Sequence, residues 1–421
     1  MNSKMFSIIV SSARRRQTGG GGGNWYNENW NYRKKITINY TKVEETLTNF
    51  PVYVDLSLLG NDFFSNVRAD GGDIRITKGD GVTELAREIV EINTTAKIGE
   101  LHFIADEISD EQNTEFYIYY GNSEAEDYEP DDDYGSQNVW DSDYIGVWHG
   151  NIKTVHFSGV VNVFKDEWDM GWVQRVSGDP FDLTWTWTGN ITIDGQTYEI
   201  YWVMDENTMV TSCMEEKTGV AYSVTDNVVY DSTANEYHLT NNGTTTGTGK
   251  IGTGIDNSQA LGYLYRTSAP GITSVFTYEA WVNLVGNQNN IFTHWEGNDW
   301  VRLYTDYGKY ADQYRRLYLS AGGNTTEGTT EEVIGWKYVC ATMDENKGLK
   351  TFIDGRQQDG SATAFYFMVP NGQLEVLVYQ GYLDEFRISK TNRSAGWIAT
   401  QYNNQNDCDE FLGVGNQESK G

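Results

Sequence analysis

A segment in the C-terminal half of the chain combines two tryptophans with polar residues. It reads Thr293-His294-Trp295-Glu296-Gly297-Asn298-Asp299-Trp300. Aromatic rings offer flat faces for sugar rings, and a few convergent polar side chains fix the orientation of a ligand. We expect a loop between strands here, with a carbohydrate site on it; the alternative is that one tryptophan caps the core. The candidate carbohydrate-binding residues are Trp295, Asn298, Trp300 and Tyr304.

The carboxylates do not have the spacing of a glycan-hydrolase centre. Retaining hydrolysis needs two carboxyl groups about 5 Å apart, and residues two apart on a strand share a face. Asp384 and Glu385 are adjacent, so we expect them to point to opposite faces. The sequence has no nucleophile-elbow, zinc-protease or phosphate-loop motif, and its five histidines occur singly. We therefore predict no catalytic residues and no enzymatic activity.

Residues 1–23 form a basic arm on an acidic protein. The arm has one lysine, three arginines and no acidic residue, and it ends in five consecutive glycines. The whole chain has 31 basic and 60 acidic residues and a net charge of −29. Such a charge disfavours nucleic acid and anionic membranes, whereas the arm suits docking on another protein of a surface assembly. The candidate docking residues are Arg14, Arg15 and Arg16.

The composition points to a folded β protein. Aromatic residues make up 14% of the 421 residues, and there are 44 glycines but only 5 prolines, which is typical of strands joined by tight turns. No apolar run has the length that a membrane span requires. The three cysteines are far apart, so we predict neither a disulfide framework nor a zinc site, with Cys340 as a buried strand residue.

From Trp25 onward, polar and apolar residues alternate in short segments, as in strands. The alternating segments are 35–40, 50–56, 73–77, 100–104 and 115–120. No segment shows a sustained helical period, so we predict a β-sandwich over residues 24–123.

Four motifs follow one another through this first region. They are Trp30-Asn31-Tyr32-Arg33-Lys34-Lys35-Ile36, Phe50-Pro51-Val52, Ala69-Asp70-Gly71-Gly72-Asp73-Ile74-Arg75 and Tyr119-Tyr120-Gly121-Asn122. The series resembles an uncharacterised domain family of bacterial, archaeal and phage surface proteins. The resemblance covers residues 25–122 and implies a β-sandwich without a known activity, commonly followed by a laminin-G-like domain.

The next region divides into a linker and an interrupted domain. Residues 124–136 are acidic, and their aspartates lack the spacing of an EF-hand loop, so we predict a solvated linker. A second domain is expected over 137–149 and 214–415, with a short tail at 416–421. Residues 150–213 are interpreted as an inserted small β subdomain with a hairpin turn at Asp194-Gly195. Trp185 and Trp187 share one face of it, which we expect to be its core; the alternative is an exposed platform.

The second domain contains a further ordered series of motifs. Among them are Lys250-Ile251-Gly252-Thr253-Gly254-Ile255-Asp256, Phe276-Thr277-Tyr278-Glu279-Ala280-Trp281-Val282 and Gly381-Tyr382-Leu383-Asp384-Glu385-Phe386-Arg387-Ile388-Ser389. The series resembles the laminin-G and concanavalin A-like lectin superfamily. It implies a jelly roll but no particular ligand, since this fold serves many functions. The fold class is therefore predicted as all-β, with two β-sandwiches and one helical turn from Ser394 to Tyr402.

The same resemblance implies a calcium ion at one rim of the second sandwich. Carboxylate and amide oxygens suit a hard cation. The candidate metal ligands are Asp256, Asn257 and Asp384. The alternative is that Asp384 accepts backbone hydrogen bonds and pins an edge turn.

These features lead us to expect a non-enzymatic virion-surface protein of a phage: a capsid decoration, fibre or receptor-binding component. The arm would anchor it in a homo- or hetero-oligomeric assembly, and the lectin-like domain would bind host glycans. The expectation rests on the surface-type modules, the oppositely charged arm and the lack of a recognisable export signal. The rivals are a bacterial cell-surface carbohydrate-binding adhesin and a glycan hydrolase. Neighbouring genes for virion proteins would favour the virion protein, and a sorting signal on the native gene would favour the adhesin. Release of reducing sugar from polysaccharides would favour the hydrolase.

Overall fold

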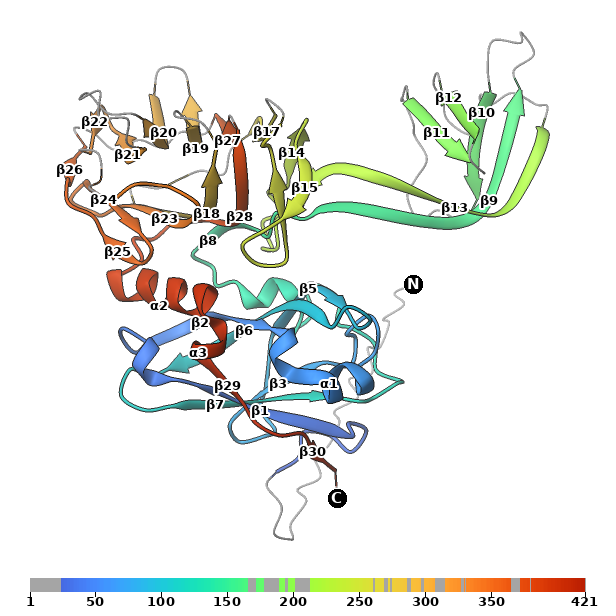
Figure 1. Cartoon of the computed structure of the whole chain (residues 1–421), viewed down its shortest axis with the longest axis horizontal. Coiled ribbons are helices and arrows are strands. Elements are labelled where there is room, and N and C mark those ends of the chain that lie inside the picture. Colours follow the sequence, from blue (N-terminus) through green and yellow to red (C-terminus); the bar gives the residue numbers. More distant parts are fainter. Residues whose placement is uncertain are drawn as a thin grey trace, which may run out of the picture.

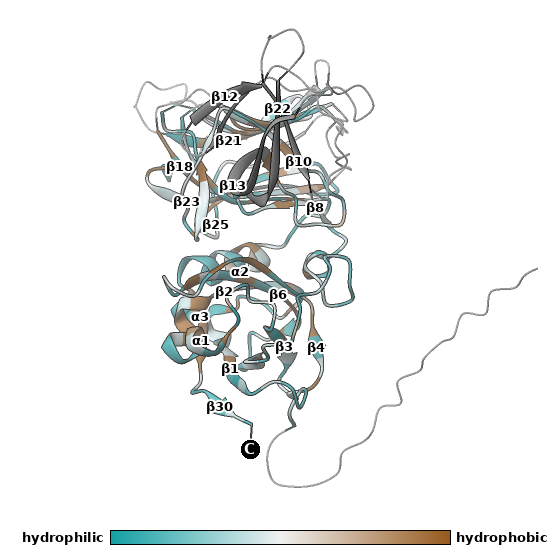
Figure 2. Cartoon of the chain, turned by 90° about the vertical axis from the view of Figure 1, so that its right-hand side faces the viewer, coloured by the Kyte–Doolittle hydropathy of each residue, from teal (hydrophilic) through white to brown (hydrophobic). Residues whose placement is uncertain are grey.

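The computed structural model describes residues 24–420 with several gaps. Residues 1–23 and 421 lie outside the description, as do 166–171, 178–188, 194–195, 201–212, 260–261, 269–271, 273–274, 286–288, 297–298, 307–314, 327–328, 330, 365–371 and 379. The described chain is nearly all β and forms two stacked β-sandwiches (Figures 1 and 2), which confirms the predicted fold class.

The first sandwich packs two antiparallel sheets against each other. One has the order β29-β1-β7-β3-β4, with β30 also paired to β1, and the other has the order β2-β6-β5. The strands are β1 (Tyr32–Ile38), β2 (Leu47–Asp55), β3 (Arg75–Lys78), β4 (Glu84–Leu85), β5 (Arg87–Asn93), β6 (Ile98–Ile108), β7 (Thr114–Tyr120), β29 (Leu412–Val414) and β30 (Glu418–Ser419). Their inward residues, such as Ile36, Val52 and Phe103, are fully buried in one core.

The second sandwich is larger. One sheet contains β8 (Tyr144–Trp148), β15 (Thr245–Thr248), β16 (Thr253–Asp256), β18 (Phe276–Leu284), β23 (Trp336–Met343), β24 (Gly348–Ile353), β25 (Arg356–Gln357), β26 (Ala362–Thr363) and β28 (Gly381–Ser389). The other contains β14 (Leu239–Asn242), β17 (Tyr263–Arg266), β27 (Gln373–Val378), β19 (Asn289–Glu296), β20 (Asp299–Asp306), β21 (Arg316–Ala321) and β22 (Asn324–Thr325), in that spatial order. Side chains such as Tyr278, Phe292 and Leu303 fill the space between the sheets.

Two long strands continue this second sheet away from the sandwich. β9 (Ile152–Lys165) and β13 (Cys213–Val229) pair antiparallel along most of their lengths and form the ribbon that extends to one side in Figure 1. At its far end β10 (Trp172–Ser177) pairs with β9, and β11 (Gly189–Ile193) pairs with β12 (Gln196–Ile200). The predicted turn at 194–195 and the Trp185 and Trp187 pair lie outside the described residues.

The C-terminal segment joins the two sandwiches. α2 (Ala395–Asn406) begins at Ser394, whose Oγ accepts a hydrogen bond from Trp397 N at 3.0 Å, an N-cap of the expected type. Figures 1 and 2 show α2 between the sandwiches. One side of the helix packs Ile398 against the second sandwich. On the other side, the Asn404 amide bonds both the N–H and the C=O of Tyr53 in β2.

The end of the chain then enters the first sandwich. α3 (Cys408–Phe411) buries Phe411 in its core, and β29 pairs with β1 from Ile36↔Val414 to Ile38↔Leu412. The sequence analysis had placed residues up to 415 in the second sandwich and 416–421 in a tail. The structure differs because the edge of β1 has unpaired backbone groups that a late segment can satisfy.

The acidic linker is not uniformly solvated, contrary to the expectation for residues 124–136. Two fully buried arginines of the first sandwich need partners, and the linker supplies them. Arg87 pairs with Asp127 at 2.6 Å, and Arg75 donates to the Glu126 carbonyl at 2.7 Å. Most other residues of the linker are exposed, including 129–133, while Ala125 and Gly135 are buried.

Several smaller features complete the fold. The short helix α1 (Gly60–Asn66) escaped the sequence analysis because two turns cannot show a sustained period; it buries Phe63 and Phe64. Cys340 is a buried free thiol on β23, as predicted. No helix of the described chain is long and apolar enough to cross a membrane. Within the described part of the chain there are also three short 3₁₀ helices: η1 (Tyr40–Lys42), η2 (Leu56–Leu59) and η3 (Ser136–Val139).

Candidate functional site

The two candidate tryptophans lie on a hairpin rather than on a loop. Trp295 on β19 is paired directly with Trp300 on β20, and their exposed fractions are 38% and 47%. The prediction of a loop was wrong, because β19 continues to Glu296 and β20 begins at Asp299. Trp295 and Trp300 lie on the outer side of this strand pair, next to the buried His294 and Val301. The alternative that one tryptophan caps the core does not hold. Asn298 lies outside the described residues.

Polar side chains flank the tryptophans on the same outer face. Antiparallel pairing places Gln373 of β27 opposite Trp295, and places Glu375 opposite Thr293. The Gln373 amide donates to the Glu375 carboxylate at 2.7 Å, which fixes the orientation of both groups. These planar groups can exchange hydrogen bonds with ligand hydroxyls.

The outer face continues with a second aromatic pair. Tyr304 of β20 stacks on Tyr318 of β21 with ring centroids 5.3 Å apart and planes 19° from parallel. The Arg302 guanidinium lies 4.1 Å from the centre of the Tyr304 ring. Tyr304 lies on the same strand as Trp300, four positions further along, and its part in carbohydrate binding stays a prediction. We call this surface the aromatic face: Trp295, Trp300, Arg302, Tyr304, Tyr318, Gln373 and Glu375.

His294 points the other way, into the core beneath the aromatic face. The residue is fully buried, its Nδ1 lies 3.2 Å from the Tyr278 hydroxyl, and its Nε2 has no hydrogen-bond partner among the described residues. Burial lowers the pKa of His294 to about 4. The folded state therefore keeps this imidazole neutral at a pH where the unfolded chain protonates it.

A pH dependence of stability follows from that shift. As the pH falls from 6.5 towards 4, the unfolded state gains a proton at this position and the folded state does not. His294→Gln removes this contribution, so wild type is expected to lose on the order of 2 kcal/mol more than the variant between pH 7 and 4.5. Urea unfolding at both pH values measures the difference. Equal losses in the two proteins would contradict it.

The three calcium candidates are already hydrogen-bonded to backbone. Asp384 accepts from the N–H groups of Ile251 and Glu385, and burial together with the neighbouring Glu385 raises its pKa. The Asn257 side-chain amide donates to the carbonyl of Gly262 and accepts from its N–H. The Asp256 carboxylate accepts from Ser258 N. Asp256 borders a hollow of about 510 Å³ on the second sandwich. Calcium binding by these residues stays a prediction, and the docking arginines 14–16 lie outside the described residues.

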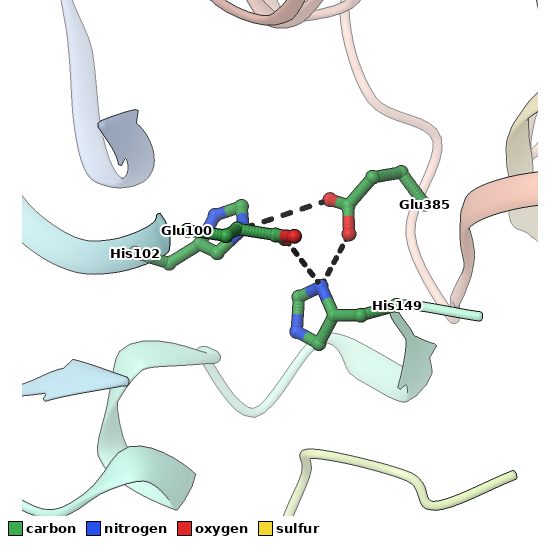
Figure 3. A group of neighbouring side chains, drawn as sticks. All are labelled: Glu100, His102, His149 and Glu385. Atoms are coloured by element: carbon green, nitrogen blue, oxygen red, sulfur yellow. Dashed lines mark hydrogen bonds and ion pairs between the residues drawn. The ribbon is translucent and has the colours of Figure 1, made fainter. Parts of the chain in front are cut away.

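A cluster that the sequence analysis missed lies where the two sandwiches meet (Figure 3). Glu100 and His102 project from the same face of β6, His149 directly follows β8, and Glu385 comes from β28. We call these four side chains the junction cluster. Each is at most 5% exposed, so the cluster can hold an ion or a proton but not a glycan.

A backbone irregularity aims Glu385 into this cluster. Across from it, Glu279 pairs with Arg387 but Trp281 pairs with Asp384, so β28 has an extra residue at a β-bulge. Glu385 there has φ 46°, the left-handed region that a residue with a Cβ seldom adopts. The bulge ends the simple alternation: Leu383 and Phe386 both lie in the core of the second sandwich, and Asp384 and Glu385 between them are both buried.

The charges of the junction cluster are strongly coupled. Burial, and then the neighbouring Glu385, raise the pKa of Glu100 to about 8. Burial lowers the pKa of His102 well below its usual value. Burial alone would also lower the pKa of His149, but Glu385 and Glu88 outweigh it and hold that pKa well above normal. The pKa of Glu385 is correspondingly held low by His149 and Arg387, against the effect of burial.

Comparisons with known proteins give structural likeness only. No protein-family model matches the chain, and no curated protein matches it. Solved structures that resemble it include domain 4 of AbnA, a GH43 extracellular arabinanase from Geobacillus stearothermophilus in complex with arabinotriose. That match has 19% identity and a TM-score of 0.34, and covers 41% of this chain and 91% of that one.

For two further structural neighbours, the match covers a smaller share of the other chain. The binding domain of Paraclostridial Mosquitocidal Protein 1 is 14% identical with a TM-score of 0.34, and the match covers 42% of this chain. This chain spans half the length of that protein, 50%. The SAP-like pentraxin from Limulus polyphemus is 12% identical with a TM-score of 0.27, over 32% of this chain and 72% of that one. The resemblances to the two families named above remain predictions.

Proposed function

We propose that this protein binds glycans through the aromatic face of its second sandwich. The observation that carries the proposal is the directly paired and exposed Trp295 and Trp300. Large aromatic rings that are exposed on a rigid sheet are in contact with water. A ligand that covers them gains the free energy of burying their apolar surface. A sugar ring offers apolar C–H faces for the rings and hydroxyl groups for the neighbouring polar side chains.

Polar groups beside Trp295 and Trp300 favour a ligand that has polar groups of its own. The Gln373–Glu375 amide–carboxylate pair lies on one side, and the Arg302 guanidinium on the other. Sheet positions hold these groups more rigidly than loop positions would, which lowers the entropy cost of binding.

The test is a glycan array probed with the full chain, with calcium and again with a chelator, followed by titration of the strongest ligand. Trp295→Ala and Trp300→Ala are each expected to weaken binding roughly 30-fold or more, as for a dominant contact residue. Trp336→Ala is the matched control, because Trp336 borders the hollow beside Asp256 on the other sheet. Blank arrays in both conditions, or full binding by both variants, would refute the proposal; loss in the control alone would place the site in the hollow.

The setting of this binding activity is also a proposal. A virion surface, with residues 1–23 as the anchor in a larger assembly, accounts for the opposite charges of the arm and the body. The rest of the chain, from residue 24 onward, is acidic and contains the aromatic face. The two parts can therefore serve anchoring and glycan attachment separately.

A further inference from the structure

We propose that one divalent transition-metal ion of the zinc class binds at the junction of the two sandwiches, held by Glu100, His102, His149 and Glu385. The ion would fix the first sandwich to the second. This inference is independent of glycan binding, because the aromatic face lies on the opposite sheet of the second sandwich.

The spacing of the four side chains fits such an ion. Glu100 Oε1 lies 3.0 Å from His102 Nε2 and 3.3 Å from His149 Nδ1, and His102 Nε2 lies 3.7 Å from Glu385 Oε2. One donor atom from each of the four residues lies within 4.8 Å of all the others. In a tetrahedral zinc site with bonds of about 2.0–2.1 Å, neighbouring ligand atoms are about 3.3 Å apart. His149 and Glu385, which are in direct contact, would have to separate for an ion to enter.

The donor types select the class of metal. Two imidazole nitrogens and two carboxylate oxygens suit zinc and its neighbours, whereas calcium and magnesium prefer all-oxygen sets. The burial of all four side chains leaves no open position for a substrate. A closed set of four protein ligands is the pattern of a structural site rather than a catalytic one.

His149 has the outer partner that metal-bound histidines usually have. Its Nδ1 faces the cluster, while its Nε2 lies 3.4 Å from the Glu88 carboxylate. Glu88 is itself fixed by hydrogen bonds from Trp140 Nε1 at 2.7 Å and Ser232 Oγ at 2.6 Å. A carboxylate behind a histidine orients the ring and raises its basicity towards the metal.

Glu385 is positioned in the same way. The Gln405 amide of α2 donates to its Oε2 at 2.9 Å, and the Arg387 guanidinium pairs with the same oxygen. Oε1 is left to face the cluster. The strained backbone of Glu385 is therefore maintained by contacts that all direct its carboxylate to one point.

The junction also brings several buried carboxylates together. Three buried carboxylates, those of Glu88, Glu100 and Glu385, surround two histidines, and Arg387 is the guanidinium that contacts this group. Buried acidic groups this close together cannot all be ionised unless protons or a cation neutralise them, and a divalent ion would take the place of the shared protons. A hollow of about 330 Å³ is lined by Gln405, which donates to Glu385, and by Tyr53, whose ring lies 5.5 Å from that of His102.

The experiment uses the untagged full chain, stripped with a chelator and then titrated with zinc chloride. We expect one zinc ion per chain by mass spectrometry of the metal, a rise in melting temperature, and, with cobalt in place of zinc, the visible absorption of a four-coordinate site. His149→Gln and Glu385→Gln should each weaken zinc binding more than 100-fold. Glu88→Gln should weaken it roughly 10- to 100-fold, as loss of an outer partner does.

His294→Gln is the matched control, because it removes a fully buried histidine of the same sandwich outside the junction cluster. This variant should keep one zinc per chain. Calcium chloride is the ion control and should not replace zinc. A wild-type protein that takes up no zinc and melts unchanged would overturn the proposal, and the junction would then be a proton-sharing network. Zinc retained by folded His149→Gln and Glu385→Gln would overturn it as well.

Discussion

Replacement of Arg387 by methionine is expected to lower the free energy of unfolding by about 3–5 kcal/mol, the usual cost of breaking a buried ion pair. Arg387 is 1% exposed, pairs with the fully buried Glu385, and lies over the Trp140 ring at 5.1 Å. Methionine fills much of the same volume but leaves the Glu385 carboxylate without this counter-charge. Urea unfolding at pH 7, followed by tryptophan fluorescence, measures the loss.

The matched control for this variant is Lys78→Met. Lys78 pairs with Asp106 at 2.6 Å, a distance typical of a good ion pair, but both side chains are well exposed at 38% and 50%. Exposed pairs contribute about 0–1 kcal/mol, so the control should unfold almost as wild type does. An Arg387→Met protein that unfolds at the same urea concentration as Lys78→Met would show that the buried pair is not needed for stability.

Phe411→Ala is expected to cost about 3–5 kcal/mol, as truncation of a fully buried aromatic residue does. Phe411 lies ten residues from the end of the chain, yet it is 0% exposed in the core of the first sandwich. Its carbonyl also accepts a hydrogen bond from Asn39 N at 3.0 Å, beside β1. The unfolding midpoint in urea measures the loss.

Hydrogen exchange identifies which sandwich this variant weakens. The amides of β1 should lose protection in Phe411→Ala, because β1 pairs with β29 directly after this residue. Ile98→Ala is the control: Ile98 is on β6 of the same sandwich but 49% exposed, so its truncation should change stability by less than about 0.5 kcal/mol. Loss of protection in β23 of the second sandwich, with β1 unchanged, would contradict the assignment of the C-terminal segment.

The sequence by itself determined the local elements of this protein. Period-two alternation is a property of neighbouring residues, so it located strands such as β1, β2 and β7 and gave the all-β class. The helical turn expected from Ser394 to Tyr402 matches the first part of α2, which the structure extends to Asn406. The exposed tryptophans were also found from sequence, although as a loop rather than a hairpin.

Only the tertiary structure decided which distant segments meet. Pairing of β29 with β1 joins residues more than 370 positions apart, and no local pattern encodes the choice of partner. The junction cluster has the same origin: Glu100 and His102 share a face by spacing, but His149 and Glu385 reach them only when the sandwiches stack. The bulge at Glu385 then reverses the face that alternation alone predicts, because one extra residue shifts the register of every side chain after it.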